Sequence, residues 1–168
     1  MSHKVLSIIV DNHSGVLARI TSLFARRGFN IDSLTVASTD DEFISRITVS
    51  LHGNDQVIDQ IINQTLKLEQ VQNVFILNPD VSLFRELLLV KVSADENKRS
   101  KVREIADIYG ASIVDLSLTS MVLELTGKPS KIDGFIKIIS EYEIIEMCRT
   151  GINALERGDV RHTVHKVK

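Results

Sequence analysis

The stretch VLSIIVDNHSGVLARITSLFARRGFNID, which runs from Val5 to Asp32, decides how the rest of the chain is organised. Its first residues are a nearly continuous apolar run, which predicts a central strand buried on both faces. The polar turn Asp11–Gly15 follows, and apolar residues at helical spacing then predict a helix that opens at the glycine. Ser14 is the expected cap of this helix, and Gly28 is its expected end.

The remainder of the first half completes one domain around this stretch. Alternating apolar residues over 30–38 and 43–51 predict the two strands of a hairpin, joined by a polar turn at 39–42. Gly53–Asp55 then starts a second helix, and residues 71–77 form a last strand that ends at Asn78–Asp80. The resulting order is the ferredoxin-like βαββαβ arrangement.

The second half of the chain repeats this order over residues 87–149. Three positions after the first helix recur at a constant spacing, because Gly28, Ile31 and Leu34 match Gly110, Ile113 and Leu116. We therefore predict an α+β protein with two tandem ferredoxin-like βαββαβ domains, whose antiparallel sheets carry helices on one face; a single fused sheet is the alternative. The expected divisions are a first domain at 1–78, a linker at 79–83, a second domain at 84–155 and a flexible basic tail at 156–168.

Composition and charge argue against several classes of protein. The chain has 168 residues, 43% of them hydrophobic and 25% charged, which is typical of globular proteins. No apolar run approaches the roughly 20 residues that cross a bilayer, and the formal net charge of −2 gives no electrostatic reason to bind nucleic acid. The start of the chain has no signal-peptide pattern and Cys148 is the single cysteine, so a cytoplasmic protein is expected. The apolar residues around Cys148 predict a buried, inert thiol.

The chain lacks the side-chain patterns that enzymes use. None of its five histidines accompanies a serine or cysteine in a nucleophile motif, and neither glycine-rich phosphate motif is present. His162 and His165 have the spacing of a metal-binding pair, but no second pair accompanies them. We therefore expect no catalytic residue and no metal site in this chain.

The turn at Gly15 has two interpretations. The glycine can serve only to make the tight connection between strand and helix. Alternatively, its missing side chain lets a ligand carboxylate approach the N–H groups of Val16 and Leu17, with Asn12 adding a hydrogen bond. The matching turn of the second half, Ala94–Lys98, has no glycine and carries two acidic residues that would repel a carboxylate. Because the fold can be built without the glycine, the comparison favours ligand binding in the first half only.

The same residues carry a resemblance to a known module. Asp11–Leu17 (DNHSGVL) followed by Arg27–Leu34 (RGFNIDSL) resembles an ACT domain, the βαββαβ module that binds amino acids in regulated metabolic proteins. Ser14 stands where the commoner ACT turn has proline. Further stretches narrow the match, namely TDDE at 39–42, ISRIT at 44–48, RELLLVKV at 85–92 and RGD at 157–159. Over residues 3 to 160 or so, the chain resembles the small regulatory subunits of acetolactate synthase, also called acetohydroxyacid synthase.

The resemblance implies a non-catalytic subunit that acts in the biosynthesis of isoleucine, leucine and valine. Such a subunit activates a separate large catalytic subunit, which carries thiamine diphosphate, magnesium and usually FAD, and it confers feedback inhibition, typically by valine. In the family, the effector lies between the ACT domains of a homodimer. Carried over by motif, the effector-binding residues are Asn12, Gly15, Val16 and Leu17 of one protomer, on the carboxylate side, and Asn30 and Ile31 of the other, facing the amino group and side chain.

Two other functions stay open on the sequence alone. One is a stand-alone ACT-domain sensor that regulates another enzyme or transcription, although the sequence has no recognisable DNA-binding segment. The other is a structural pairing module that binds no ligand. Binding of an amino acid would exclude the structural pairing module. Binding to a catalytic partner would exclude the stand-alone sensor.

Overall fold

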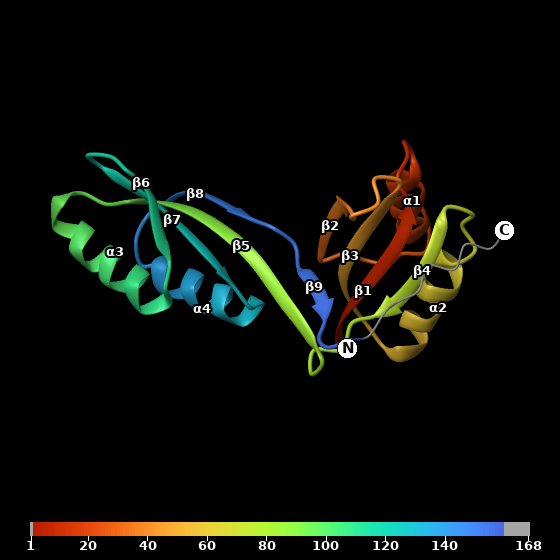
Figure 1. The fold of residues 1–168 in the computed structure, drawn as a ribbon. Helices are drawn as coiled ribbons and strands as arrows, with labels where there is room; N and C mark the ends of the chain where they lie inside the picture. The colour runs from red at the N-terminus through yellow and green to blue at the C-terminus, as the bar shows by residue number, and fades with distance from the viewer. Residues whose placement is uncertain (1, 160–168) are drawn as a thin grey trace. The chain divides into compact units, whose positions relative to one another are not determined.

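The first strand of the chain is a central strand of a four-stranded antiparallel sheet (Figure 1). The computed structural model describes residues 2–159. The first sheet has the strand order β2-β3-β1-β4, and β1 pairs with β3 from Ser2 opposite Gly53 to Asp11 opposite Ile44. The elements of this half are β1 (Ser2–Asp11), α1 (Val16–Arg26), β2 (Ser33–Ser38), β3 (Ile44–Gly53), α2 (Asp55–Thr65) and β4 (Val71–Ile76).

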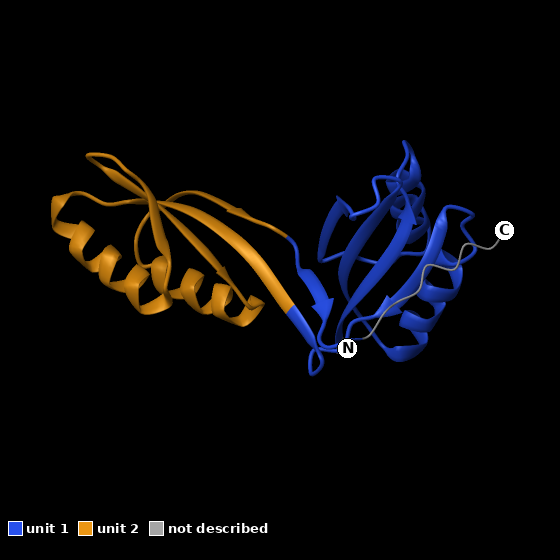
Figure 2. Cartoon of the chain, in the orientation of Figure 1, with its two compact units in different colours: residues 1–83, 151–168 blue, residues 84–150 orange. Residues whose placement is uncertain are grey.

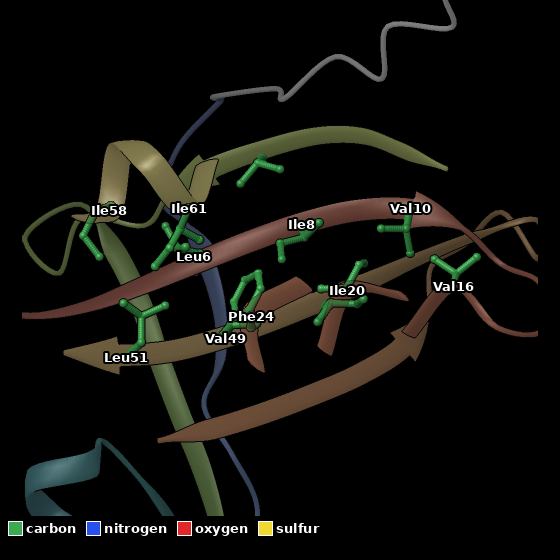
Figure 3. Close-up of a cluster of buried hydrophobic side chains, with 12 residues drawn as sticks. Leu6, Ile8, Val10, Val16, Ile20, Phe24, Val49, Leu51, Ile58 and Ile61 are labelled. Carbon is green, nitrogen blue, oxygen red and sulfur yellow. The ribbon is translucent and has the colours of Figure 1, made fainter. Parts of the chain in front are cut away.

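Alternate residues of β1 face the two helices and form the core of the first half (Figure 3). Leu6, Ile8 and Val10 are buried on this face. They pack in one cluster with side chains from both helices, namely Ile20 and Phe24 of α1 and Ile58 and Ile61 of α2. Val5 and Ile9 are buried on the opposite face. The strand is therefore buried on both faces, as its apolar run predicts.

The second half forms a sheet and a core of its own. Its strands have the order β6-β7-β5-β8, and a further strand, β9, pairs with β5. Leu88, Val90 and Val92 of β5 are fully buried together with Ile132 and Phe135 of the last helix. The elements are β5 (Ser82–Ser93), α3 (Glu96–Tyr109), β6 (Ser112–Leu116), β7 (Ser120–Gly127), α4 (Pro129–Ile139), β8 (Ile144–Arg149) and β9 (Asn153–Glu156). The α+β fold with two tandem βαββαβ halves is confirmed, and β9 is an addition that the sequence did not predict.

The compact units of the structure divide the chain differently from the domains expected from the sequence (Figure 2). One unit contains residues 1–83 with the described part of 151–168, and the other contains residues 84–150. The expected second domain, 84–155, includes Gly151–Leu155, which the structure groups with the first unit instead. The physical reason is close packing, since a Cβ added to Gly151 would lie 2.6 Å from the hydroxyl oxygen of Thr35 on β2. Ile152 and Ala154 are correspondingly buried.

Cys148 is exposed, so the expectation of a buried thiol is wrong. It lies in β8, opposite Leu89 of β5, and within residues 2–159 β8 is an edge strand that pairs with β5 alone. Its neighbour Arg149 reaches Asp133 of α4 and so faces the helices. Because successive strand residues point to opposite faces, Cys148 lies on the face without helices. An edge strand with one uncovered face leaves such a side chain in solvent.

We expect the exposed Cys148 to react with Ellman's reagent in the folded protein. One nitrothiobenzoate thiolate should be released from the reagent per chain, at a rate close to that in the unfolded chain. The chain has only this cysteine, so the absorbance of the released thiolate reports on it alone. Cys148→Ser is the blank and should give no signal. A thiol that reacts only after denaturation would contradict the exposed position.

Three further expectations concern the basic tail, metal sites and membrane-spanning helices. The basic tail is covered only as far as Asp159, and the pair His162 and His165 lies outside the described residues. Within residues 2–159, no cluster of three or more histidine, cysteine, aspartate or glutamate side chains could hold a metal ion. None of the helices in this range is both long and apolar enough to cross a membrane.

Candidate functional site

The turn between β1 and α1 places a glycine at the start of the helix, without a capping side chain. Gly15 has φ 87° and ψ −14°, a left-handed conformation that residues with side chains rarely adopt. Its carbonyl accepts the first helical hydrogen bond from the N–H of Arg19 at 3.0 Å. The expected cap by Ser14 is wrong, because no side chain accepts a hydrogen bond at this helix start.

The first N–H groups of α1 are available to a ligand. Among the described residues, the N–H groups of Leu17 and Ala18 have no hydrogen-bond partner, and that of Val16 reaches the carbonyl of His13 only at 3.4 Å. The first turn of the helix contains no acidic residue. An oxyanion here would therefore be held by unpaired N–H groups and by the positive end of the helix dipole together.

The space in front of the turn is open. A Cβ added at Gly15 would have no heavy atom within 4 Å, and residues 12–15 are exposed. Val16 is 4% exposed and contributes only its backbone, whereas Leu17 is 38% exposed. The turn thus presents hydrogen-bond donors beside an aliphatic surface.

Asn12 is held against the hairpin formed by β2 and β3. Its side-chain Nδ2 donates to the carbonyl of Glu42, and its backbone N–H donates to the carbonyl of Phe43, each at 2.7 Å. These bonds fix the turn and leave one amide hydrogen and the amide oxygen for a ligand. Asn12 therefore positions the turn through its hydrogen bonds to the hairpin.

Asn30 and Ile31 lie beyond the other end of α1. The helix has 11 residues, so it is about 16 Å long at 1.5 Å per residue. Asn30 is exposed, with its amide 3.4 Å from Asp32, and Asp32 pairs with His52 at 2.6 Å. Ile31 is partly buried against the first core. The structure brings Asn12, Gly15, Val16 and Leu17 together, and it leaves Asn30 and Ile31 apart from them within one chain.

The corresponding turn of the second unit fills the equivalent position with its own carboxylate. Asp95 is the N-cap of α3, and its Oδ1 accepts the N–H groups of Asn97 and Lys98 at 3.0 and 3.1 Å. Glu96 adds a second acidic side chain in the first turn of α3. A carboxylate ligand therefore has a place at the start of α1 and none at the start of α3.

The sequence did not predict that the segment Gly151–Glu156 belongs to the first unit. This segment lies against β2, and its β9 part lines a pocket together with Thr35 and Arg46. The available signal was Asn153 between the apolar residues Ile152 and Ala154, which is too short a pattern to identify a strand.

Comparisons with known proteins cover nearly the whole chain. Residues 6–73 match the family described as "AHAS small subunit-like ACT domain", and residues 85–158 match the family described as "Small subunit of acetolactate synthase". The "Probable acetolactate synthase small subunit" of Archaeoglobus fulgidus is 42% identical over 159 residues, which is 95% of this chain and 99% of that one. The "Acetolactate synthase isozyme 3 small subunit" of Escherichia coli is 38% identical over 93% of this chain and 96% of its own length. The crystal structure of the acetolactate synthase small subunit from Thermotoga maritima superposes with a TM-score of 0.88 at 35% identity, covering 95% of this chain and 100% of that one.

Proposed function

The chain belongs to the acetolactate synthase small-subunit family, and on that premise we propose that it activates a large catalytic subunit and confers feedback inhibition by valine. The resemblance noted in the sequence is confirmed by this membership. A small subunit implies a large partner that carries the chemistry. Thiamine diphosphate, magnesium and FAD are proposed for that partner and not for this chain, and a cytoplasmic location stays a prediction.

The observation that carries the proposal is the contrast between the two helix starts. The N–H groups of Leu17 and Ala18 are unpaired within the described residues, while Asp95 occupies the equivalent position in the second unit. A free amino acid brings the carboxylate that α1 lacks. The exposed aliphatic side chain of Leu17 suits a ligand with a branched apolar side chain. One methylene in an apolar pocket discriminates by only about 1–3 kcal/mol, so the preference for valine over its homologues rests on the family.

A second protomer is needed to complete this site. Asn30 and Ile31 lie about one helix length from Gly15 in the same chain. We therefore propose a homodimer in which Asn30 and Ile31 of the partner meet the amino group and side chain of the effector. The amide oxygen of Asn30 is an acceptor suited to an ammonium group.

Regulation then follows from differential binding. Valine between two protomers stabilises the arrangement of ACT domains that completes the site, at the expense of others. The catalytic subunit must bind those arrangements with different affinity, or valine could not inhibit it. Inhibition is therefore a property of the assembled enzyme.

A thermal-unfolding screen of the twenty amino acids tests the proposal. We expect valine, and to a smaller extent leucine and isoleucine, to raise the unfolding temperature of the full chain. A ligand at 100 times its dissociation constant stabilises the folded state by about 2.7 kcal/mol. D-valine is the control, because it carries the same groups with the wrong handedness. No shift with any amino acid would favour a structural pairing module instead.

Affinity capture separates the remaining alternative. We expect the chain to retain a large thiamine-diphosphate-dependent protein from an extract of its own organism, and to raise that protein's activity when the two are mixed. A stand-alone sensor would shift in the thermal screen but would neither retain nor activate such a protein.

A further inference from the structure

A pocket of about 400 Å³ is lined by residues of β2, β3 and β9 and of the turn after β2. The register pairs Thr35 with Thr48 and Ala37 with Arg46, so these four residues share one face. Val49, the neighbour of Thr48 on β3, belongs to the helix-facing core. The remaining walls are the turn at residues 38–40 and residues 153–155 of β9. Small-molecule sites in proteins begin at about 300 Å³, so the volume suits a ligand of a few heavy atoms.

Two of the residues that line the pocket carry buried polar atoms without a hydrogen-bond partner. Within residues 2–159, the Nε of Arg46 and the hydroxyl oxygen of Thr35 are buried without a hydrogen-bond partner. Such groups are rare in folded proteins, because they lose their hydration without compensation. The guanidinium of Arg46 lies over the ring of Phe75, 5.7 Å from its centre. Because its Nε is unpaired, the guanidinium makes no side-on, two-point contact with a carboxylate of residues 2–159.

Charges of both signs line this pocket. Arg46 is the one basic residue among the residues that line it, and Asp40 is the one acidic residue. The pKa of Arg46 is lowered, because the effect of burial outweighs that of the nearby carboxylate of Glu156, which raises it. A ligand with only a negative charge would be repelled by Asp40, and a ligand with only a positive charge by Arg46. A molecule that carries one charge of each sign meets neither penalty.

We propose that this pocket binds a small polar amino acid, with its carboxylate on Arg46, its ammonium group on Asp40 and its side chain on the hydroxyl and amide groups of the walls. Serine and threonine have the required size and a side-chain hydroxyl. The lining favours such side chains, because its members are largely polar, namely Thr35, Ser38, Thr39, Thr48 and Asn153 beside Ala37, Ala154 and Leu155. The site is separate from the turn at Gly15 and needs only one protomer.

Isothermal titration of the full chain with threonine tests this site. We expect saturable binding of threonine and much weaker binding of two probes that each lack one charge, lactate without the ammonium group and ethanolamine without the carboxylate. Arg46→Gln should weaken threonine binding about tenfold or more, because a charge-assisted hydrogen bond is lost. Asp59→Asn, a change at an exposed acid elsewhere in the same unit, should leave it unchanged.

The threonine pocket and the valine site at Gly15 are distinguished by testing the variant of each site with the ligand of the other. Arg46→Gln should keep the thermal shift with valine, and Gly15→Asp should keep the titration with threonine. Thr35→Val, which has the same shape without the hydroxyl, serves if Arg46→Gln does not fold. Absence of threonine binding, equal binding in Arg46→Gln, loss of binding in Gly15→Asp, or binding of lactate as tight as that of threonine would each overturn the assignment.

Discussion

Gly15→Asp is expected to abolish inhibition by valine in the enzyme reassembled from this chain and its catalytic partner, while the first unit stays folded. A carboxylate at position 15 would take the N–H groups proposed for the effector, as Asp95 does at the start of α3. It would also repel the effector's own carboxylate. Like charges placed together in a binding site cost several kcal/mol, which corresponds to an affinity loss of about 100-fold or more.

The matched control for this variant is Gly110→Asp. Gly110 also has a positive φ, 64°, and no heavy atom within 4 Å of an added Cβ. Both variants therefore carry a similar backbone strain, of about 1–3 kcal/mol, but Gly110 ends α3 in the second unit. Acetolactate formation is measured against valine concentration for both, together with the unfolding temperature. Inhibition of the Gly15→Asp enzyme at the wild-type valine concentration would rule out the proposed site.

Arg149→Met is expected to destabilise the second unit more than any surface substitution. Arg149 joins three elements, because its Nε donates to Glu86 of β5 at 3.0 Å and its Nη1 donates to Asp133 of α4 at 2.7 Å. Burial lowers the pKa of Arg149, but these hydrogen bonds and charges outweigh it and raise the pKa. The side chain of Glu86 is only 6% exposed. Removing the arginine leaves this carboxylate buried without its cation, which costs about 3 kcal/mol once the partial exposure of Arg149 is allowed for.

Chemical denaturation of the full chain, followed by circular dichroism, measures the loss. Arg103→Met is the control, since Arg103 forms an ion pair with Asp107 at 3.9 Å in which both side chains are more than 70% exposed. That exposed ion pair should contribute almost nothing to the free energy of unfolding. Glu86→Leu combined with Arg149→Met should recover much of the stability, because two apolar side chains leave no charge unpaired. Equal effects of Arg149→Met and Arg103→Met would contradict the role given to Glu86.

The architecture was predictable because its signals are local and repeated. The apolar run from Val5 to Val10 predicts a strand with both faces covered, and the helical spacing of Ile20 and Phe24 marks the helix face that covers one of them. The recurrence of Gly28 as Gly110 then shows that the same unit occurs twice. These patterns depend on neighbours within a few residues, which is the range over which sequence determines local structure.

The errors of prediction have a different origin. Cys148 lies in an apolar stretch, yet sequence periodicity does not reveal that β8 is an edge strand with one uncovered face. Ser14 has the chemistry of a cap, but the left-handed Gly15 is the residue that starts the helix. The position of Gly151 against Thr35 depends on residues more than a hundred positions apart, which no local pattern reports. For the candidate site, the helix predicted between Gly15 and Gly28 already separates Asn30 from the turn, and the assignment of these residues to one site stays a prediction.

The return of Gly151–Glu156 to the first unit has a consequence for synthesis on the ribosome. Proteins are made from the amino terminus, and domains generally fold in that order as they emerge. Here the second unit is continuous over residues 84–150, whereas the first includes residues that follow it. The second unit is thus the first whose chain is complete, and the pocket beside Arg46 has no third wall until residue 155 has been added. The core of the first unit lies within residues 6–74, so its last element, β9, is added only after the second unit has been made.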